Sequence, residues 1–174
     1  MIWVIVVGVI VVLFGAAAFF GAPYVPSQRR YVERAFSDLY QLSKKDLLVD
    51  IGSGDGMVLR LARQKGARAV GYEINPALVV ISRWLSRGDS AVRVEWANFW
   101  RRPLPKGTTV VYAFSVQRDA NRLERKMQAE ADAAGRPLEL LAYGSPLRGV
   151  TPDATLDAYY RYTFKPSQAK KVTL

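Results

Sequence analysis

A turn with glycines at positions 52, 54 and 56 constrains the fold of this chain more than any other feature. An apolar run at 47–49 precedes the turn, and a stretch of helical character up to Lys65 follows it. Glycine adopts positive φ angles and has no Cβ, so the backbone can pass close to a ligand. A helix that begins behind the turn points free N–H groups and its dipole at that ligand. Segment 47–75 therefore predicts a strand, a ligand-binding turn, a helix and a second strand.

The charges around this turn indicate what kind of ligand it binds. A dinucleotide site has the spacing G-x-G-x-x-G, but here the third glycine comes one residue early and Met57 takes its place. Asp50 and Asp55 flank the turn and would repel a pyrophosphate, whereas they suit a ligand with an ammonium and a sulfonium group. Glu73, at the predicted end of the second strand, can accept hydrogen bonds from two ribose hydroxyls. The alternative is a turn that binds nothing, but such a turn requires neither three glycines nor the spaced acid.

The pattern D-x-G-x-G-D-G, followed by Gly-Tyr-Glu-Ile-Asn at 71–75, resembles class I S-adenosylmethionine-dependent methyltransferases. With the connector Ala-Pro-Tyr-Val-Pro-Ser at 22–27, segment 23–149 resembles the membrane-anchored lysine methyltransferases of the ATP synthase c-subunit and the adenine nucleotide translocase. The resemblance implies a Rossmann-like α/β fold with a mostly parallel, seven-strand-type sheet and helices on both faces. It implies S-adenosyl-L-methionine as cofactor. The cofactor-binding residues that it implies are Asp50, Gly52, Ser53, Gly54, Asp55, Gly56, Glu73, Ile74, Asn75, Asn98 and Phe99.

The resemblance also suggests residues for the methyl acceptor. Asn98-Phe99-Trp100 stands where the family has an acid, an apolar residue and a tryptophan. Asn98 would bond the adenine amino group and orient the attacking amine as the catalytic residue, while Phe99 would pack on the adenine ring. The alternative is that Phe99 and Trp100 are ordinary core aromatics. The substrate candidates are Tyr24, Trp100 and Ser115, the last of which closes a predicted strand where open α/β sheets place their ligand crevice.

The composition of the chain excludes several kinds of catalytic and metal-binding site. The chain has no Cys and no His, which excludes disulfides, thiol nucleophiles, zinc sites of the Cys/His type and a histidine base. We expect no metal. The net charge of +10 lies wholly after residue 28 and suggests an acidic partner, either nucleic acid or an anionic membrane surface.

The N-terminal segment 1–22 is apolar and carries no charge. At about 1.5 Å per residue such a helix spans roughly 30 Å, enough to cross a bilayer, so we expect a single-pass transmembrane helix. A cleaved signal peptide is the alternative, although a basic n-region is missing. Arg29, Arg30 and Arg34 follow the segment, which places the catalytic domain on the cytoplasmic side, or the matrix side for a mitochondrial protein.

The remaining organisation follows from the periodicity of hydrophobic residues and from the positions of proline and glycine. We expect a connector and cofactor-covering helix over 23–45, a methyltransferase domain over 46–166 and a basic tail over 167–174. Within the domain we expect a helix from Pro76 that Gly88 stops, and a second helix over 119–134. Further strands are expected over 91–97, 108–114, 138–143 and 156–164, the last of them antiparallel.

These expectations combine into one leading function, methylation of a lysine in a membrane-protein substrate. The lysine amine must be neutral to attack, and a desolvated channel beside the cofactor's positive charge would lower its pKa, so no histidine base is needed. Methylation of a lipid-like or quinone molecule is a second hypothesis. A non-catalytic cofactor-fold membrane assembly protein is a third. Nucleic-acid methylation is disfavoured because no Asn/Asp-Pro-Pro-aromatic tetrad is present.

Overall fold

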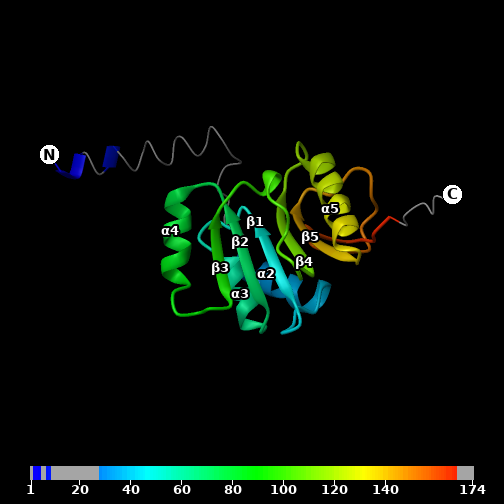
Figure 1. Cartoon of the computed structure of the whole chain (residues 1–174), viewed down its shortest axis with the longest axis horizontal. Helices are drawn as coiled ribbons and strands as arrows, with labels where there is room; N and C mark the ends of the chain where they lie inside the picture. Colours follow the sequence, from blue (N-terminus) through cyan, green and yellow to red (C-terminus); the bar gives the residue numbers. More distant parts are fainter. Residues whose placement is uncertain (1, 5–6, 9–27, 168–174) are drawn as a thin grey trace.

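The computed structural model describes residues 2–4, 7–8 and 28–167. Its centre is a seven-stranded sheet in the order β3-β2-β1-β4-β5-β7-β6 (Figure 1). The five strands β1 to β5 are parallel, whereas β7 runs antiparallel to β5, and β6 antiparallel to β7. The strands are β1 Leu47–Ile51, β2 Arg68–Glu73, β3 Val92–Trp96, β4 Val110–Ser115, β5 Leu138–Gly144, β6 Ala154–Leu156 and β7 Tyr159–Phe164.

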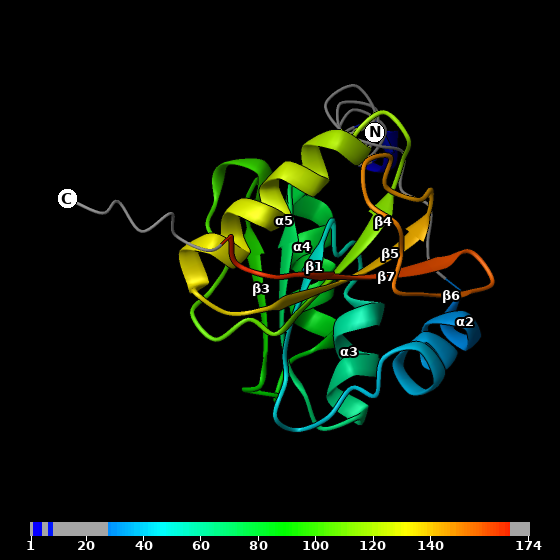
Figure 2. The same ribbon diagram turned by 90° about the vertical axis from the view of Figure 1, so that its right-hand side faces the viewer.

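Helices cover both faces of the sheet. Figure 2 shows α5 on one side and α2 with α3 on the other, and α4 packs Val79 into the same cluster as α3. The helices are α2 Arg29–Arg34, which continues as the π-helix η1 Ala35–Leu39, then α3 Met57–Gln64, α4 Pro76–Leu85, the short 3-10 helix η2 Phe99–Arg101 and α5 Ala120–Ala134.

The pattern of β1 explains this layering. Its first four residues are all buried, as expected of a parallel strand covered on both faces. Leu48 packs toward α3, and its neighbours Leu47 and Val49 pack toward α5. β1 pairs with β2 on one side and with β4 on the other, so the strand order reverses beside it. Open α/β sheets bind ligands at this reversal, outside the carboxyl ends of the strands.

The Rossmann-like sheet agrees with the sequence-based expectation, but the end of the domain differs. The single strand expected over 156–164 is a hairpin, in which Leu156 of β6 pairs with Tyr159 of β7. Asp157 adopts φ 51° between them. Aspartate tolerates this left-handed conformation, so the chain reverses through two residues inside what reads as one β-rich run.

The predicted transmembrane helix over 1–22 is wrong as a feature of this fold. Among the helices that the structure describes, none is long and apolar enough to cross a membrane. Most of segment 1–22 lies outside the described residues, and the described parts, 2–4 and 7–8, are short helical pieces. A spanning helix needs about 20 consecutive apolar residues. The expected placement on the cytoplasmic side of a membrane stays a prediction.

Candidate ligand-binding site at the carboxyl edge of the sheet

The glycine turn lies between the ends of β1 and β2 and is held there by the backbone. The N–H groups of Gly52 and Ser53 both donate to the carbonyl of Tyr72, at 2.8 and 3.1 Å. Gly52 has φ 80°, and a Cβ built there would meet nothing within 4 Å, so the turn borders open space at this point. At Gly56 a Cβ would come 2.1 Å from the Ser82 hydroxyl of α4. The first glycine therefore leaves room for a ligand, whereas the third lets α4 pack closely.

Glu73 ties the turn to the loop that follows β2. Its side chain is buried, and its two oxygens accept from the N–H groups of Gly54 and Asn75, both at 2.8 Å. A carboxylate offers about four lone-pair sites, so two acceptor positions are left for a ligand's hydroxyls. Glu73 thus shapes the site in addition to the role that the sequence predicts for it.

Asp50 is the ionisable residue of the site with the most unusual surroundings. It is buried, and burial, reinforced by the nearby charges of Glu73 and Asp55, raises the pKa of its carboxyl well above the ordinary value. Among the described residues, none forms an ion pair with Asp50 or Glu73. Asp55 differs, because its carboxylate pairs with Arg60 at 3.1 Å. A cationic ligand would supply the positive charge that this buried pair of carboxylates lacks.

The other predicted cofactor residues lie around the same edge. Asn75 is buried and caps α4, accepting from the N–H of Ala77 at 3.0 Å, whereas Ile74 is 41% exposed. The hydroxyl of Ser53 is buried, packs over Gly71 and has no hydrogen-bond partner among the described residues.

The segment after β3 presents Asn98 and buries Phe99. Asn98 is exposed and begins η2, with its side-chain oxygen accepting from the N–H of Trp100 at 3.0 Å. Phe99 lies in the hydrophobic cluster beneath α5, with its ring edge-on to Trp100 and Lys126 over its face. Arg122 lies over the Trp100 ring at 4.3 Å. The packing of Phe99 corresponds to the core alternative, while Asn98 stays accessible from the edge.

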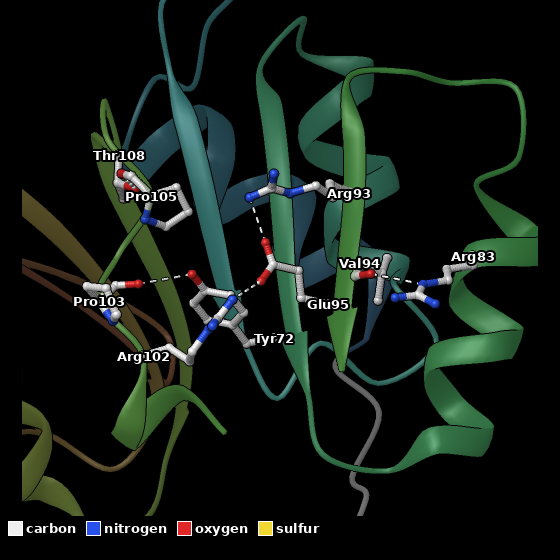
Figure 3. Close-up of polar contacts among 9 residues, drawn as sticks. All are labelled: Tyr72, Arg83, Arg93, Val94, Glu95, Arg102, Pro103, Pro105 and Thr108. Atoms are coloured by element: carbon white, nitrogen blue, oxygen red, sulfur yellow. Dashed lines mark hydrogen bonds and ion pairs between the residues drawn. The ribbon is translucent and has the colours of Figure 1, made fainter. Parts of the chain in front are cut away.

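Polar contacts on the α5 side of the sheet hold this segment in place (Figure 3). Glu95 of β3 pairs with Arg93 and with Arg102, at 2.6 and 3.0 Å. The hydroxyl of Tyr72 donates to the carbonyl of Pro103 at 3.0 Å, and burial raises the pKa of that hydroxyl. The contacts of Arg102 and Pro103 fasten the loop that carries Asn98 to β2 and β3.

An aromatic row at the ends of β4 and β5 was not predicted from the sequence. Phe114, 37% exposed, packs edge-on against Tyr143 with ring centroids 5.5 Å apart. Tyr143 stacks on Tyr159 at 4.7 Å, and the hydroxyl of Tyr159 lies 3.1 Å from that of Tyr112. Alternation along 108–114 could have placed residues 112 and 114 on one face. The partners on β5 and β7 depend on strand register, which the sequence does not reveal.

Of the substrate candidates, Ser115 follows Phe114 directly at the end of β4, so its side chain points to the opposite face of the sheet from the aromatic row. Its buried hydroxyl has no hydrogen-bond partner among the described residues. Trp100 lies against α5, on the face away from that row. Tyr24 lies outside the described residues.

The comparisons with known proteins agree on a methyltransferase family. Residues 50–154 match the model of the ANTKMT methyltransferase domain. Two curated relatives are named as lysine N-methyltransferases of the ATP synthase c-subunit: the Xenopus laevis protein is 33% identical over 84% of this chain, and the Homo sapiens protein 31% over 87%. The Mus musculus adenine nucleotide translocase lysine N-methyltransferase is 36% identical over 66% of this chain. The chain spans 67%, 66% and 50% of the lengths of these three relatives.

Solved structures share the fold. An RNA methyltransferase from Salinibacter ruber in complex with S-adenosyl-L-homocysteine has a TM-score of 0.74 and 25% identity, covering 84% of this chain and 97% of that one. A geranyl diphosphate C-methyltransferase from Streptomyces coelicolor has a TM-score of 0.52 and 22% identity, covering 65% of this chain and 44% of that one. At that identity the second likeness concerns the fold alone.

Proposed function

This chain belongs to the ANTKMT methyltransferase domain family, and on that premise we propose that it methylates a lysine of a membrane protein with S-adenosylmethionine as the methyl donor. The observation that carries the proposal is the buried pair Asp50 and Glu73 beside the glycine turn, which has no cationic partner among the described residues. The cofactor carries an ammonium and a sulfonium group. The relatives' names supply the acceptor class, since they specify lysines of the ATP synthase c-subunit and of adenine nucleotide translocase.

The first part of the site would bind the cofactor. The open space at Gly52 would let the ligand approach the backbone, and the remaining acceptor positions of Glu73 would take the ribose hydroxyls. Asp50 would face the positive charge. Asn98 is accessible from the edge, and its side-chain oxygen already accepts one backbone hydrogen bond, which leaves its amide N–H groups and a second lone pair for adenine or for the acceptor amine.

The second part of the site would receive the lysine. When bound, S-adenosylmethionine supplies a methyl group that passes from its sulfur to the lone pair of the neutral amine, while the electrons of the carbon–sulfur bond stay on sulfur. A lysine with a free pKa of about 10.4 must first lose a proton to water. Phe114 and Tyr143 would surround its stem with apolar surface, which disfavours the charged form. Their ring faces would still attract the incoming ammonium.

The test is transfer of labelled methyl groups from S-adenosylmethionine to a cell extract by the purified full-length chain. The products are separated into a protein fraction, an RNA fraction and an organic extract. We expect label in the protein fraction, on the lysine of an integral membrane protein located by peptide mass spectrometry. Glu73→Ala serves as the inactive control. Calorimetry that detects no binding of the cofactor would overturn the proposal at its first step.

RNA methylation is the second candidate. The net charge of +10 and the likeness to an RNA methyltransferase over 97% of that chain favour it. Label in the RNA fraction, with none on protein, would establish it instead. Label in the organic extract would point to a lipid-like acceptor.

A further inference from the structure

Helix α4 has two apolar faces, and only one of them is covered. Leu78, Val79 and Ser82 are buried toward the sheet. On the opposite side Val80 is 66% exposed and Trp84 is 60% exposed. A helix that is apolar all round is normally buried on all sides. The outer face of α4 is therefore apolar and not covered by any element among the described residues.

The exposed apolar surface continues beyond the helix to the edge that holds the ligand site. Trp96, at the end of the outermost strand β3, is 68% exposed, and its indole N–H donates to the carbonyl of Ile74 at 2.9 Å. Ile74 lies two residues before the start of α4 and directly after Glu73. We call this set the α4 surface: Ile74, Val80, Ile81, Trp84, Leu85 and Trp96. Figure 1 shows α4 at the outer side of the sheet, next to β3.

The charged residues of α4 and of the turn that follows it, up to Gly88, are both arginines. No acidic residue occurs between Asn75 and Gly88. Arg87 lies over the ring of Trp84 at 4.6 Å, and Arg83 donates to the carbonyl of Val94. Neither arginine forms an ion pair with a carboxylate of the described residues. Both border an open hollow of about 420 Å³ beyond the end of α4, where Asp89 is already paired with Arg63.

We propose that the α4 surface docks peripherally on the surface of an anionic lipid bilayer. Tryptophans and aliphatic side chains enter the headgroup boundary, while arginines attract anionic headgroups, which is the composition of interfacial helices. A soluble protein partner would satisfy the apolar side chains, but it would not require the unpaired arginines. Docking does not depend on the proposed function. Its consequence does: the carboxyl edge, where Ile74 and Trp96 lie, would then be held beside the bilayer, close to acceptor lysines at the bilayer surface.

The chain has no cysteine, so a single introduced thiol reports on one position of the full-length protein. Val80→Cys places an environment-sensitive fluorophore on the α4 surface, and Ala129→Cys places it on the exposed side of α5 as the matched control. Vesicles of phosphatidylcholine are compared with vesicles that also contain phosphatidylglycerol. We expect a blue shift at position 80 with the anionic vesicles, weakened by salt, and none at position 129. Equal shifts at both positions, or with both lipids, would overturn the proposal.

A second experiment removes one positive charge at a time. Arg87→Gln should weaken binding to anionic vesicles about fivefold, the loss expected for one arginine near a charged leaflet. Arg125→Gln, on the exposed side of α5, should change it less than twofold. Both variants should keep the cofactor affinity of the parent, which separates this test from that of the proposed function. A fluorophore at position 80 that is already buried without lipid, in a species twice the monomer mass, would replace the bilayer with a second copy of the chain.

Discussion

The two halves of the carboxyl edge are built in different ways. After β1 and β2, polar groups are held by backbone N–H groups and by one local ion pair. The carboxylate of Glu73 accepts two backbone hydrogen bonds, and Asp55 pairs with Arg60. After β4 and β5, the edge consists of ring contacts between Phe114, Tyr143 and Tyr159. Local backbone contacts preorganise the first half for one fixed ligand. The second half depends on the register of three strands, β4, β5 and β7.

The largest effect is expected at Glu73, on which both loops of the first half depend. Glu73→Ala leaves the buried N–H groups of Gly54 and Asn75 without their acceptor, at about 1–3 kcal/mol each. We expect cofactor affinity to fall at least about hundredfold and the free energy of unfolding to decrease. Calorimetric titration and urea unfolding measure the two effects. Glu73→Gln keeps one oxygen and should lose less cofactor affinity than the alanine variant. Equal cofactor affinities for the parent and the alanine variant would remove Glu73 from the site.

The second effect concerns pH and Asp50. Because the pKa of Asp50 is raised in the folded protein, the folded form retains a proton that the unfolded chain has released. The carboxyl therefore lowers the stability of the ligand-free protein as pH rises above 3.8 toward the raised pKa. A cationic ligand favours the ionised form, so affinity should increase as pH rises through that pKa, with proton release.

Asp50→Asn should remove this pH dependence, stabilise the ligand-free protein at neutral pH and weaken cofactor binding about tenfold, the effect of one lost charge contact. Calorimetry in buffers of different ionisation enthalpy measures the proton release. An unchanged pH profile of binding in the variant would contradict the assignment of Asp50 to the ligand's charge.

The same contrast explains what the sequence could predict. The glycine turn and the position of Glu73 could be predicted because both depend on local backbone conformation and fixed spacing. The hairpin at Asp157 was missed because one residue with positive φ reverses the chain without a glycine. The aromatic row was missed because Tyr143 and Tyr159 become neighbours only through antiparallel pairing of β5 with β7. The exposure of Val80 and Trp84 was not predicted either, since an apolar residue at helical spacing does not show which face of a helix is covered.

The third effect should separate the two halves. Phe114→Ala removes the exposed ring at the end of β4 and leaves every hydrogen bond of the glycine turn in place. We expect kcat/KM for the protein acceptor to fall about tenfold, as one ring contact with a desolvated cation is worth roughly 1–2 kcal/mol. The Kd for S-adenosylmethionine should stay within twofold of the parent. A parallel loss of cofactor affinity would show that the halves are not independent.

The smallest effect is expected where the aromatic row enters the core. Burial raises the pKa of Tyr159 to about 12, so at neutral pH its hydroxyl is protonated and shares a hydrogen bond with that of Tyr112. Tyr159→Phe removes this bond but keeps the ring stacked on Tyr143. The free energy of unfolding should fall by about 0.5–1.5 kcal/mol, the usual net value of one hydrogen bond. Cofactor affinity should not change, and acceptor turnover should change less than in Phe114→Ala, because the hydroxyl lies in the core and not at the edge. Urea unfolding, calorimetric titration of the cofactor and the kinetics of acceptor methylation measure these three effects. A loss of turnover as large as that of Phe114→Ala, at unchanged cofactor affinity, would mean that the position of the exposed ring depends on the buried hydroxyl pair. Residues of the core would then contribute to the position of the acceptor.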